Sequence, residues 1–463
     1  MVLLLSVASH MTRSPILVRR LQLLLAITSI FIHLTTTIHA EPVDPPIEQP
    51  PTALITGNLN TWDLIFASRT PQLILDGRAN NIHWTEGPVL VGEDDDVQFL
   101  LFSDTVGGKL YSFDLATRKL QILKDRSGDA SPADDHWRAE PGSNGLAVLV
   151  DQIDGGGGGN GGSSPKLLVC QHGARRVVTM NLKTHEIEPL ATEYNGKKLN
   201  GPNDICIRSE KRMLGGERGN THALYAYFTD PVYAWLEKDR FDDLPYLDET
   251  VREKGPGHCG VYRVEIQSHT TSDSVNKGNV ELITLTMARP NGIGFDRDNL
   301  IVSDCCQGSH LDGCTSGTSR WEILRQRVVG SGSGNNYPNE KSSPSGWVHI
   351  SIVEDIVSAE QAVGGCADGF AVYNLDDYNG GGEQHFLLAS CFGGFCIVDL
   401  TSETVVARIW TAKDEYGGCR ISNVVVGRSR VYLTGSCGIF MLPLRIIGDD
   451  DGLSYGVISN NPA

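Results

Sequence analysis

The sequence predicts an all-β protein, a six-bladed β-propeller with a metal site at its central channel, from three observations. A motif of polar and turn residues recurs six times, each copy begins a strand-like apolar run, and the repeat unit has a nearly constant size apart from two enlarged copies. The polar residues that head the copies are Glu86, Asn144, Asn203, Asn291, Asp368 and Asn423. They are 58, 59, 88, 77 and 55 residues apart. A repeat of this length made of short strands is typical of a radial propeller and not of a helical solenoid.

Each repeat unit contains further short strands after its head residue. The second strand often ends in a hydroxyl residue followed by an acid, as in Ser103-Asp104, Thr229-Asp230 and Ser303-Asp304. A third strand of alternating apolar and polar residues follows, for example at 110–113. The last unit ends near residue 445, so residues 71–76 are expected to complete its sheet from the N-terminal side and remove the open edge.

The innermost strands of a propeller line one channel, so the six head side chains are expected to converge there. Taken singly, Asn-Gly, Asn-Asp or Asp-Gly indicates a hairpin turn. Because they share one register, Glu86, Asn203, Asn291 and Asp368 are predicted to hold a hard divalent cation through oxygen atoms. Asn144 has the same register and is expected to line the channel.

The first 40 residues have the pattern of a secretory signal peptide. Arginines at 13, 19 and 20 precede an apolar stretch at 21–32, and Ala40 is a small residue at a suitable cleavage position. The stretch is shorter than the ~20 residues that span a bilayer, and an uncleaved membrane anchor is the alternative. The remaining domains are expected to be a Pro-rich lead-in at 41–58, the propeller at 59–446 and a polar tail at 447–463.

The mature chain is acidic. Its formal charge is −17, and removing residues 1–40, which contain three arginines and no acids, changes it to −20. Such a chain is a poor partner for nucleic acid, whose phosphates are bound by clusters of Lys and Arg.

All eleven cysteines lie after residue 40. Following a secretory signal, this indicates some disulfide pairing, with at least one thiol left over and the connectivity open. No Cys-x-x-Cys pair is present, so a structural zinc site is disfavoured. The protein is therefore expected to be secreted or to reside in the secretory-pathway lumen, with no stable membrane span after signal cleavage.

Several motifs resemble those of the gluconolactonase family, which includes regucalcin, and they occur in the family's order across residues 75–445. They are Thr85-Glu86-Gly87-Pro88, Ser143-Asn144-Gly145, Gln171-His172-Gly173, Gly201-Pro202-Asn203-Asp204, Thr229-Asp230-Pro231, Arg289-Pro290-Asn291-Gly292 and Ala367-Asp368-Gly369. The resemblance implies a six-bladed propeller with one divalent cation, whose ligands map onto Glu86, Asn203, Asn291 and Asp368. Departures are Ala367, where the family often has Pro, and enlarged units with insertions at 231–258 and 305–346.

The resemblance implies a metal-dependent lactonase that opens sugar lactones by attack of water on the carbonyl. In this reading Asp368 is the general base, and Asn144, His172 and Asn203 contact the substrate. The all-oxygen ligand set favours Ca²⁺, Mg²⁺ or Mn²⁺, and relatives with zinc keep Zn²⁺ open; Ca²⁺ is the first choice.

Two alternatives remain. The first is a non-enzymatic propeller that binds a partner through its inserted loops. The second is a related lactonase or esterase acting on other lactones or organophosphates.

Overall fold

The computed structural model describes the chain from β1 onward, with gaps. The described residues are 54–92, 99–135, 137–149, 165–212, 221–238, 250, 253–266, 279–285, 287–305, 320–326, 347–353, 366–375, 383–391, 393–410 and 418–445. The predicted signal peptide, the C-terminal tail and most of the insertion at 305–346 lie outside these ranges.

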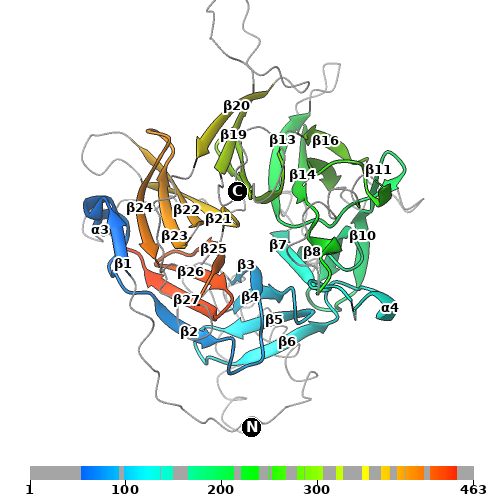
Figure 1. The fold of residues 1–463 in the computed structure, drawn as a ribbon, viewed down its shortest axis with the longest axis horizontal. Helices are drawn as coiled ribbons and strands as arrows, with labels where there is room; N and C mark the ends of the chain where they lie inside the picture. The colour runs from blue at the N-terminus through cyan, green and yellow to red at the C-terminus, as the bar shows by residue number, and fades with distance from the viewer. Residues whose placement is uncertain are drawn as a thin grey trace, which may run out of the picture. The chain divides into compact units, whose positions relative to one another are not determined.

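Six antiparallel sheets form the blades of the part described (Figure 1). Blade 1 contains β3 (Thr85–Val91), β4 (Phe99–Asp104), β5 (Lys109–Asp114) and β6 (Leu120–Asp125). Blade 2 contains β7 (Ser143–Leu149), β8 (Lys166–Gln171), β9 (Arg176–Asn181) and β10 (Ile187–Ala191). Blade 3 contains β13 (Ile205–Arg212), β14 (Thr221–Asp230), β15 (Gly260–Ile266) and β16 (Glu281–Thr284).

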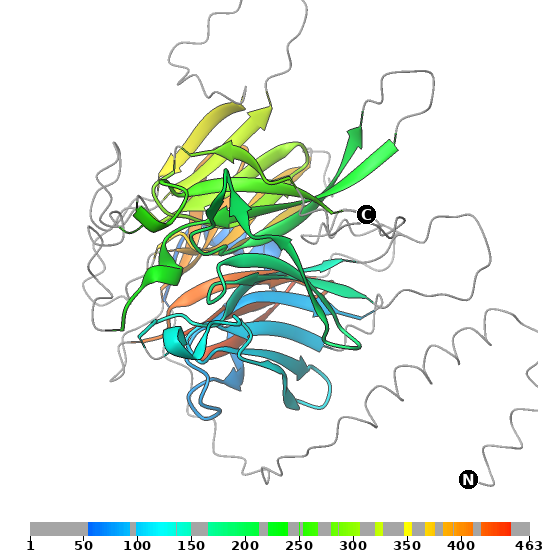
Figure 2. The same cartoon turned by 90° about the vertical axis from the view of Figure 1, so that its right-hand side faces the viewer.

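The second half of the ring repeats this arrangement. Blade 4 contains β17 (Pro290–Asp296), β18 (Asn299–Asp304), β19 (Arg320–Gln326) and β20 (Trp347–Val353). Blade 5 contains β21 (Phe370–Leu375), β22 (Gln384–Cys391), β23 (Gly394–Asp399) and β24 (Thr404–Trp410). Blade 6 contains β25 (Ile421–Val426), β26 (Arg430–Gly435) and β27 (Gly438–Pro443). A separate hairpin joins β11 (Glu193–Tyr194) to β12 (Lys197–Lys198), and the long β13–β14 hairpin projects past the neighbouring sheets (Figure 2).

The first strands of the six blades form a closed ring. β3 contacts β7, and the contacts continue through β13, β17, β21 and β25 back to β3. Each first strand is therefore innermost in its blade, and closure leaves no inner edge exposed. The predicted six-bladed β-propeller is confirmed.

Two strands from the N-terminal side complete blades at the C-terminal end of the chain. β2 (Gln72–Asp76) pairs antiparallel with β27, which confirms the expected closing strand. β1 (Leu54–Gly57), within the segment expected as a lead-in, pairs antiparallel with β24 and adds a fifth strand to blade 5. The N-terminal region is thus hydrogen-bonded to the last two blades.

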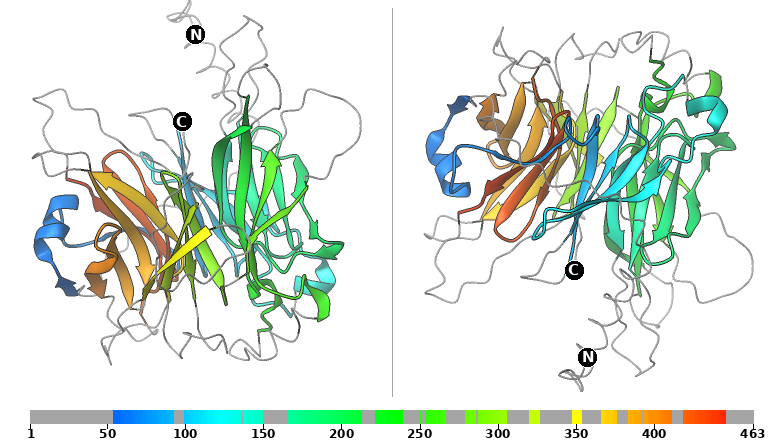
Figure 3. Two further views of the ribbon diagram at one scale, coloured as in Figure 1. Left: turned by 90° about the horizontal axis from the view of Figure 1, so that it is seen from above. Right: turned by 90° about the horizontal axis from the view of Figure 1, so that it is seen from below.

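Apolar side chains between the blades form the core. The largest group lies between blades 5 and 6 and includes the short helix α3 (Leu59–Ile65), which packs on the outer side of β24 (Figure 3). Trp62 and Phe66 are fully buried there against Phe395. Asn58 accepts hydrogen bonds from the amides of residues 60 and 61 and so caps the helix at its N-terminus.

Two disulfides occur among the described residues, Cys305–Cys366 and Cys419–Cys437. They are typical of proteins from an extracellular or secretory environment. The described part of the chain contains no helix that is both long and apolar enough to cross a membrane.

Candidate functional site

The predicted head residues lie at the inner ends of the six blades, where each first strand begins. In blades 1, 2, 4 and 6 the pairing of the first and second strands shifts register at the head. Such bulges redirect side chains and are common beside functional sites. Five of the head side chains are buried, whereas Asp368 is partly exposed.

Neighbouring heads approach each other closely because glycine follows four of them. A Cβ on Gly87 would lie 2.5 Å from the Asn144 carbonyl oxygen, and one on Gly292 would lie 2.4 Å from the Asp368 carbonyl oxygen. Real Cβ atoms do not approach oxygen so closely, so the recurring Glu-Gly, Asn-Gly and Asp-Gly pairs allow the inner strands to pack side by side.

Hydroxyl groups at the ends of the second strands fix the head of the next blade. Each donates a hydrogen bond to a head carbonyl oxygen across the blade boundary. The pairs are Ser103 Oγ to Asn144 O at 2.8 Å, Thr229 Oγ1 to Asn291 O at 2.6 Å and Ser303 Oγ to Asp368 O at 2.6 Å. These bonds couple the backbone position of each head to its neighbour.

The acid that follows each of these hydroxyls holds the head of its own blade. Its carboxylate accepts a hydrogen bond from the backbone amide two residues before the head. The pairs are Asp104 with Trp84 N at 3.1 Å, Asp230 with Gly201 N at 2.8 Å and Asp304 with Arg289 N at 2.7 Å. The hydroxyl-acid pairs seen in the sequence are therefore a hydrogen-bonded frame around the site.

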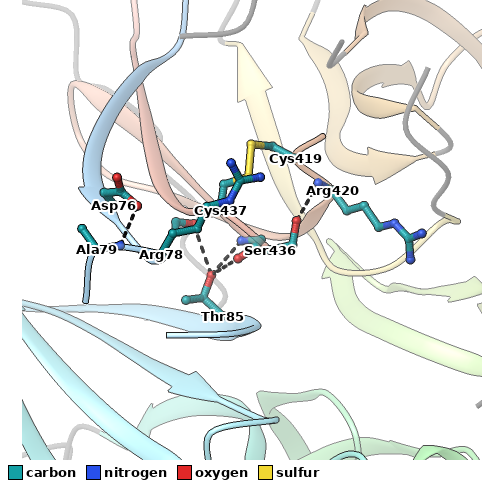
Figure 4. The surroundings of a disulfide bond; sticks show 10 residues. Asp76, Arg78, Ala79, Thr85, Cys419, Arg420, Ser436 and Cys437 are labelled. Carbon is teal, nitrogen blue, oxygen red and sulfur yellow. Dashed lines mark hydrogen bonds between the residues drawn. A yellow bond between two sulfur atoms is a disulfide. The ribbon is translucent and has the colours of Figure 1, made fainter. Parts of the chain in front are cut away.

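Blade 6 is joined to blade 1 by a similar frame (Figure 4). Thr85 Oγ1 donates to Gly435 O at 2.9 Å and accepts from Gly435 N at 2.7 Å. The Cys419–Cys437 disulfide lies beside this turn and connects it to the segment that leads into β25. This fixes the residue before Glu86 at the point where the ring closes.

Side chains from four blades meet at the centre of the ring. The carboxyl groups of Glu86 and Asp368 lie within hydrogen-bond reach of each other. The Asn423 amide is within reach of both Glu86 and Asp204. Trp84 Nε1 donates to Glu86 Oε1 at 2.8 Å. Glu86, Asp368, Asp204 and Asn423 therefore interact with one another, whereas the convergence of Asn144, Asn203 and Asn291 on the same point stays a prediction.

Burial and mutual repulsion perturb these acids strongly. Burial, followed by the negative charges of Asp204 and Glu140, raises the pKa of Glu86 to about 8. Burial and the charge of Glu86 hold the pKa of Asp368 well above its usual range. Burial raises the pKa of Asp204 to about 6, against hydrogen bonds from the backbone amides of Ile205 and Ile293. Carboxyl groups in such an arrangement favour a cation between them.

Unpaired amide oxygens give an independent test of whether the residues fit a cation. The Oδ1 atoms of Asn144 and Asn291 are buried and have no hydrogen-bond partner. A buried, unpaired oxygen is costly, and coordination of a hard cation satisfies it. The described residues contain no group of three or more His, Cys, Asp or Glu side chains placed to hold a metal, so any site here depends on asparagine oxygens. The donor set of Glu86, Asn203, Asn291 and Asp368 fits a hard cation.

His172 lies next to Glu140, a residue that was not predicted to belong to the site. Its ring is fully buried, and its Nδ1 is 3.3 Å from Glu140 Oε2. Neither ring nitrogen has a hydrogen-bond partner. The imidazole therefore faces the Glu140 carboxylate.

Sequence reasoning did not identify Asp204, Glu140 or Tyr233 as residues of this site. Asp204 directly follows Asn203 in the turn dipeptide Asn-Asp. This dipeptide indicated a site residue, but only its first residue, Asn203, was predicted to belong to the site. Glu140 belongs to a loop and Tyr233 begins the short 3₁₀ helix η2 (Tyr233–Trp235), and both interact with Asp368 only in the folded chain. No spacing rule within one repeat unit locates them.

Comparison with known proteins agrees with the motifs. A curated gluconolactonase from Zymomonas mobilis is 27% identical over 249 residues, which cover 53% of this chain and 55% of that protein. The chain thus matches about half the length of that relative. No protein-family model matches the chain.

Solved structures with a similar strand arrangement include three proteins. A proposed gluconolactonase has a TM-score of 0.48 and 19% identity, covering 85% of this chain and 98% of its own. A calcium-binding regucalcin from Agrobacterium tumefaciens has a TM-score of 0.39 and 12% identity, covering 82% and 93%. A calcium-containing carbohydrate-active enzyme of Trichoderma reesei has a TM-score of 0.44 and 12% identity, covering 87% and 100%. The resemblance to gluconolactonases that the motifs indicated is confirmed by the sequence relative.

Proposed function

We propose that the protein is a hydrolase that opens sugar lactones with the help of one divalent cation at the centre of the propeller. The observation that carries the proposal is the interaction between the carboxyl groups of Glu86 and Asp368, from blades 1 and 5. The buried Oδ1 atom of Asn291, the head residue of blade 4, has no hydrogen-bond partner and adds a further oxygen donor. Sequence similarity to a gluconolactonase supports the lactonase class.

Glu86, Asn203, Asn291 and Asp368 would hold the cation through their side-chain oxygens. Ca²⁺ suits this set of oxygens best, and Mg²⁺, Mn²⁺ and Zn²⁺ are the alternatives. When bound, the cation polarises the lactone carbonyl and lowers the pKa of water beside it.

Asp368 is assigned as the general base. It is the only one of the six head residues that is partly exposed. A bound cation would offset the burial and the charge of Glu86 that raise the pKa of Asp368, so its carboxylate would be ionised and able to accept a proton. Asp368 removes a proton from the attacking water as its oxygen adds to the carbonyl carbon of a bound lactone, and it passes that proton to the ring oxygen as the ring C–O bond breaks, which leaves a hydroxyl group and a carboxylic acid. Ser303 and Ser390 hold the backbone of Asp368, through its carbonyl oxygen at 2.6 Å and its amide at 2.9 Å, so the base is preorganised.

Asn144, Asn203 and His172 are assigned to substrate binding, in different ways. The unpaired Oδ1 of Asn144 can accept a hydrogen bond from a substrate hydroxyl. Asn203 is shared between the cation and the substrate. His172 is fully buried and acts through the Glu140 carboxylate.

The proposal is tested by pH-stat titration of acid released from glucono-1,5-lactone, with the spontaneous rate subtracted. Turnover is expected to be lost on chelation and restored by Ca²⁺ in folded protein. Asp368→Asn should lose most of kcat, because a general base contributes on the order of 10²-fold or more. Full activity of the chelated protein or of Asp368→Asn would contradict the assignment.

A further inference from the structure

Two loops that lie far apart in the sequence pair beside the site. Ala139 N donates to Leu236 O at 2.9 Å, and Lys238 N donates to Trp137 O at 3.0 Å. Ala139, Val232, Trp235 and Leu236 are buried together with Cys259 in a separate apolar cluster. We call residues 137–140 and 232–238 the loop pair. Because it is hydrogen-bonded and has its own apolar core, the loop pair holds its side chains in place.

The loop pair places Glu140 at the site. Glu140 is four residues before the head residue Asn144, and its carboxylate contacts His172, which directly follows β8, so it lies at the same end of blade 2 as Asn144. In agreement with this position, its negative charge contributes to the raised pKa values of Glu86 and Asp368. The Glu140 side chain is 15% exposed, whereas the His172 ring behind it is 0% exposed. Glu140 is therefore within reach of solvent, whereas His172, its contact on the protein side, is not.

Tyr233 lies on the other loop of the pair and packs against its apolar cluster. Burial raises the pKa of Tyr233, and the charges of Asp368 and Glu140 raise it further, while Arg289 opposes them. The phenol therefore remains protonated and can donate a hydrogen bond.

His172 supplies the second indication of a ligand. The His172 imidazole is fully buried and neither nitrogen makes a hydrogen bond, which is costly, and such exceptions occur where a side chain serves a function. Its Nδ1 is 3.3 Å from Glu140 Oε2, close enough to orient the carboxylate. The unpaired Oδ1 of Asn144 adds a further open acceptor.

We propose that Glu140 is a substrate-contacting residue that selects a neutral, hydroxyl-bearing lactone and repels its carboxylate product, with His172 as its positioning residue. The proposal rests on the lactonase function. Glu140 accepts a hydrogen bond from a hydroxyl of the intact ring. Hydrolysis adds water across the ring ester bond and leaves a hydroxy acid that ionises, so a new negative charge appears beside Glu140, and repulsion then favours product release.

The test compares two substrates and one product. Kinetics are measured with glucono-1,5-lactone, which bears hydroxyl groups, and with δ-valerolactone, which bears none, and inhibition is measured with gluconate. The variants are Glu140→Ala, Glu140→Gln and His172→Gln, with Glu193→Gln on the exposed β11 strand as the matched control. Glu140→Gln keeps the size and a hydrogen-bond acceptor but removes the charge, and it remains informative if Glu140→Ala fails to fold.

Glu140→Ala should lower kcat/KM for glucono-1,5-lactone by ~10- to 100-fold, mainly through KM, as expected for a lost hydrogen bond to a charged group. It should change kcat/KM for δ-valerolactone by no more than about twofold, because that ring offers no hydroxyl to Glu140. Glu140→Gln should keep kcat/KM but bind gluconate roughly tenfold more tightly, since one like charge is gone. His172→Gln should also lower kcat/KM for glucono-1,5-lactone, as Glu140→Ala does, because the Glu140 carboxylate loses its positioning residue.

Equal losses with both lactones would overturn the proposal, because they would indicate a general role in folding or chemistry. Unchanged gluconate inhibition in Glu140→Gln would overturn the product-repulsion part. If the wild type hydrolyses neither lactone with any cation, the lactonase function itself fails, and this inference fails with it.

Discussion

Glu86→Gln should stabilise the metal-free protein at alkaline pH although it removes a cation ligand. In the metal-free protein, burial and the neighbouring acids raise the pKa of Glu86 from 4.5 to about 8. A carboxyl group with a raised folded-state pKa contributes stability that is fully present below the unfolded pKa, near 4.5. That stability is lost as the pH rises through about 8.

The expected size follows from the pKa difference. Between 4.5 and about 8, at about 1.36 kcal/mol per unit, ionisation of Glu86 destabilises the folded metal-free chain by on the order of 5 kcal/mol above pH 8. A chain of this length loses about 1 °C in Tm per kcal/mol, so Glu86→Gln should melt on the order of 5 °C higher than wild type at pH 9. At pH 4 the variant and the wild type should have the same Tm.

The assay is thermal unfolding in chelator at pH 4, 7 and 9, repeated with saturating Ca²⁺. Ca²⁺ should raise the Tm of wild type, more at high pH, and should have little effect on Glu86→Gln. Glu193→Gln, at an exposed position, is the control for the loss of one negative charge. If Glu86→Gln melts below chelated wild type at pH 9, the account of the carboxyl cluster is wrong.

Two further substitutions test the frame around the site. Gly87→Ala should cost ~2–4 kcal/mol in unfolding experiments, because a Cβ would lie 2.5 Å from Asn144 O at φ +54°; Gly196→Ala, at φ +73° with open space around it, should cost only ~1 kcal/mol. Equal costs would contradict the close-approach argument. Ser303→Ala should lower stability by ~1–2 kcal/mol and weaken Ca²⁺ binding in calorimetric titration, because it removes the 2.6 Å bond to Asp368 O; unchanged Ca²⁺ affinity would mean that Asp368 is held by other contacts.

The fold was predictable because each blade repeats one local pattern. A polar head, a glycine and an apolar run recur at the start of four of the first strands or directly before them, and the last unit lacks a strand that residues 71–76 supply. These features depend on turn chemistry and strand alternation, which are encoded locally. The edge strand β1 was not expected, because the fifth unit already supplies the four strands β21 to β24 and so lacks none that β1 would replace.

The site was predictable only in part, because local sequence patterns do not encode contacts between segments that are far apart in the chain. The six heads share a register, so their convergence follows from propeller geometry. Glu140 reaches the cluster because its loop pairs with residues 232–238, about 100 residues later in the chain. The hydroxyl-acid pairs were visible at strand ends, but their bonds cross blade boundaries or reach back to the preceding loop, which no pattern within one strand reveals.

The most direct test of the central claim is a crystal structure of the protein soaked with Ca²⁺, with the ion located by its anomalous signal. The account predicts one ion at the centre of the ring, with oxygen atoms of Glu86, Asn203, Asn291 and Asp368 at about 2.3–2.6 Å. An empty centre at saturating Ca²⁺, or an ion held by other residues, would contradict it.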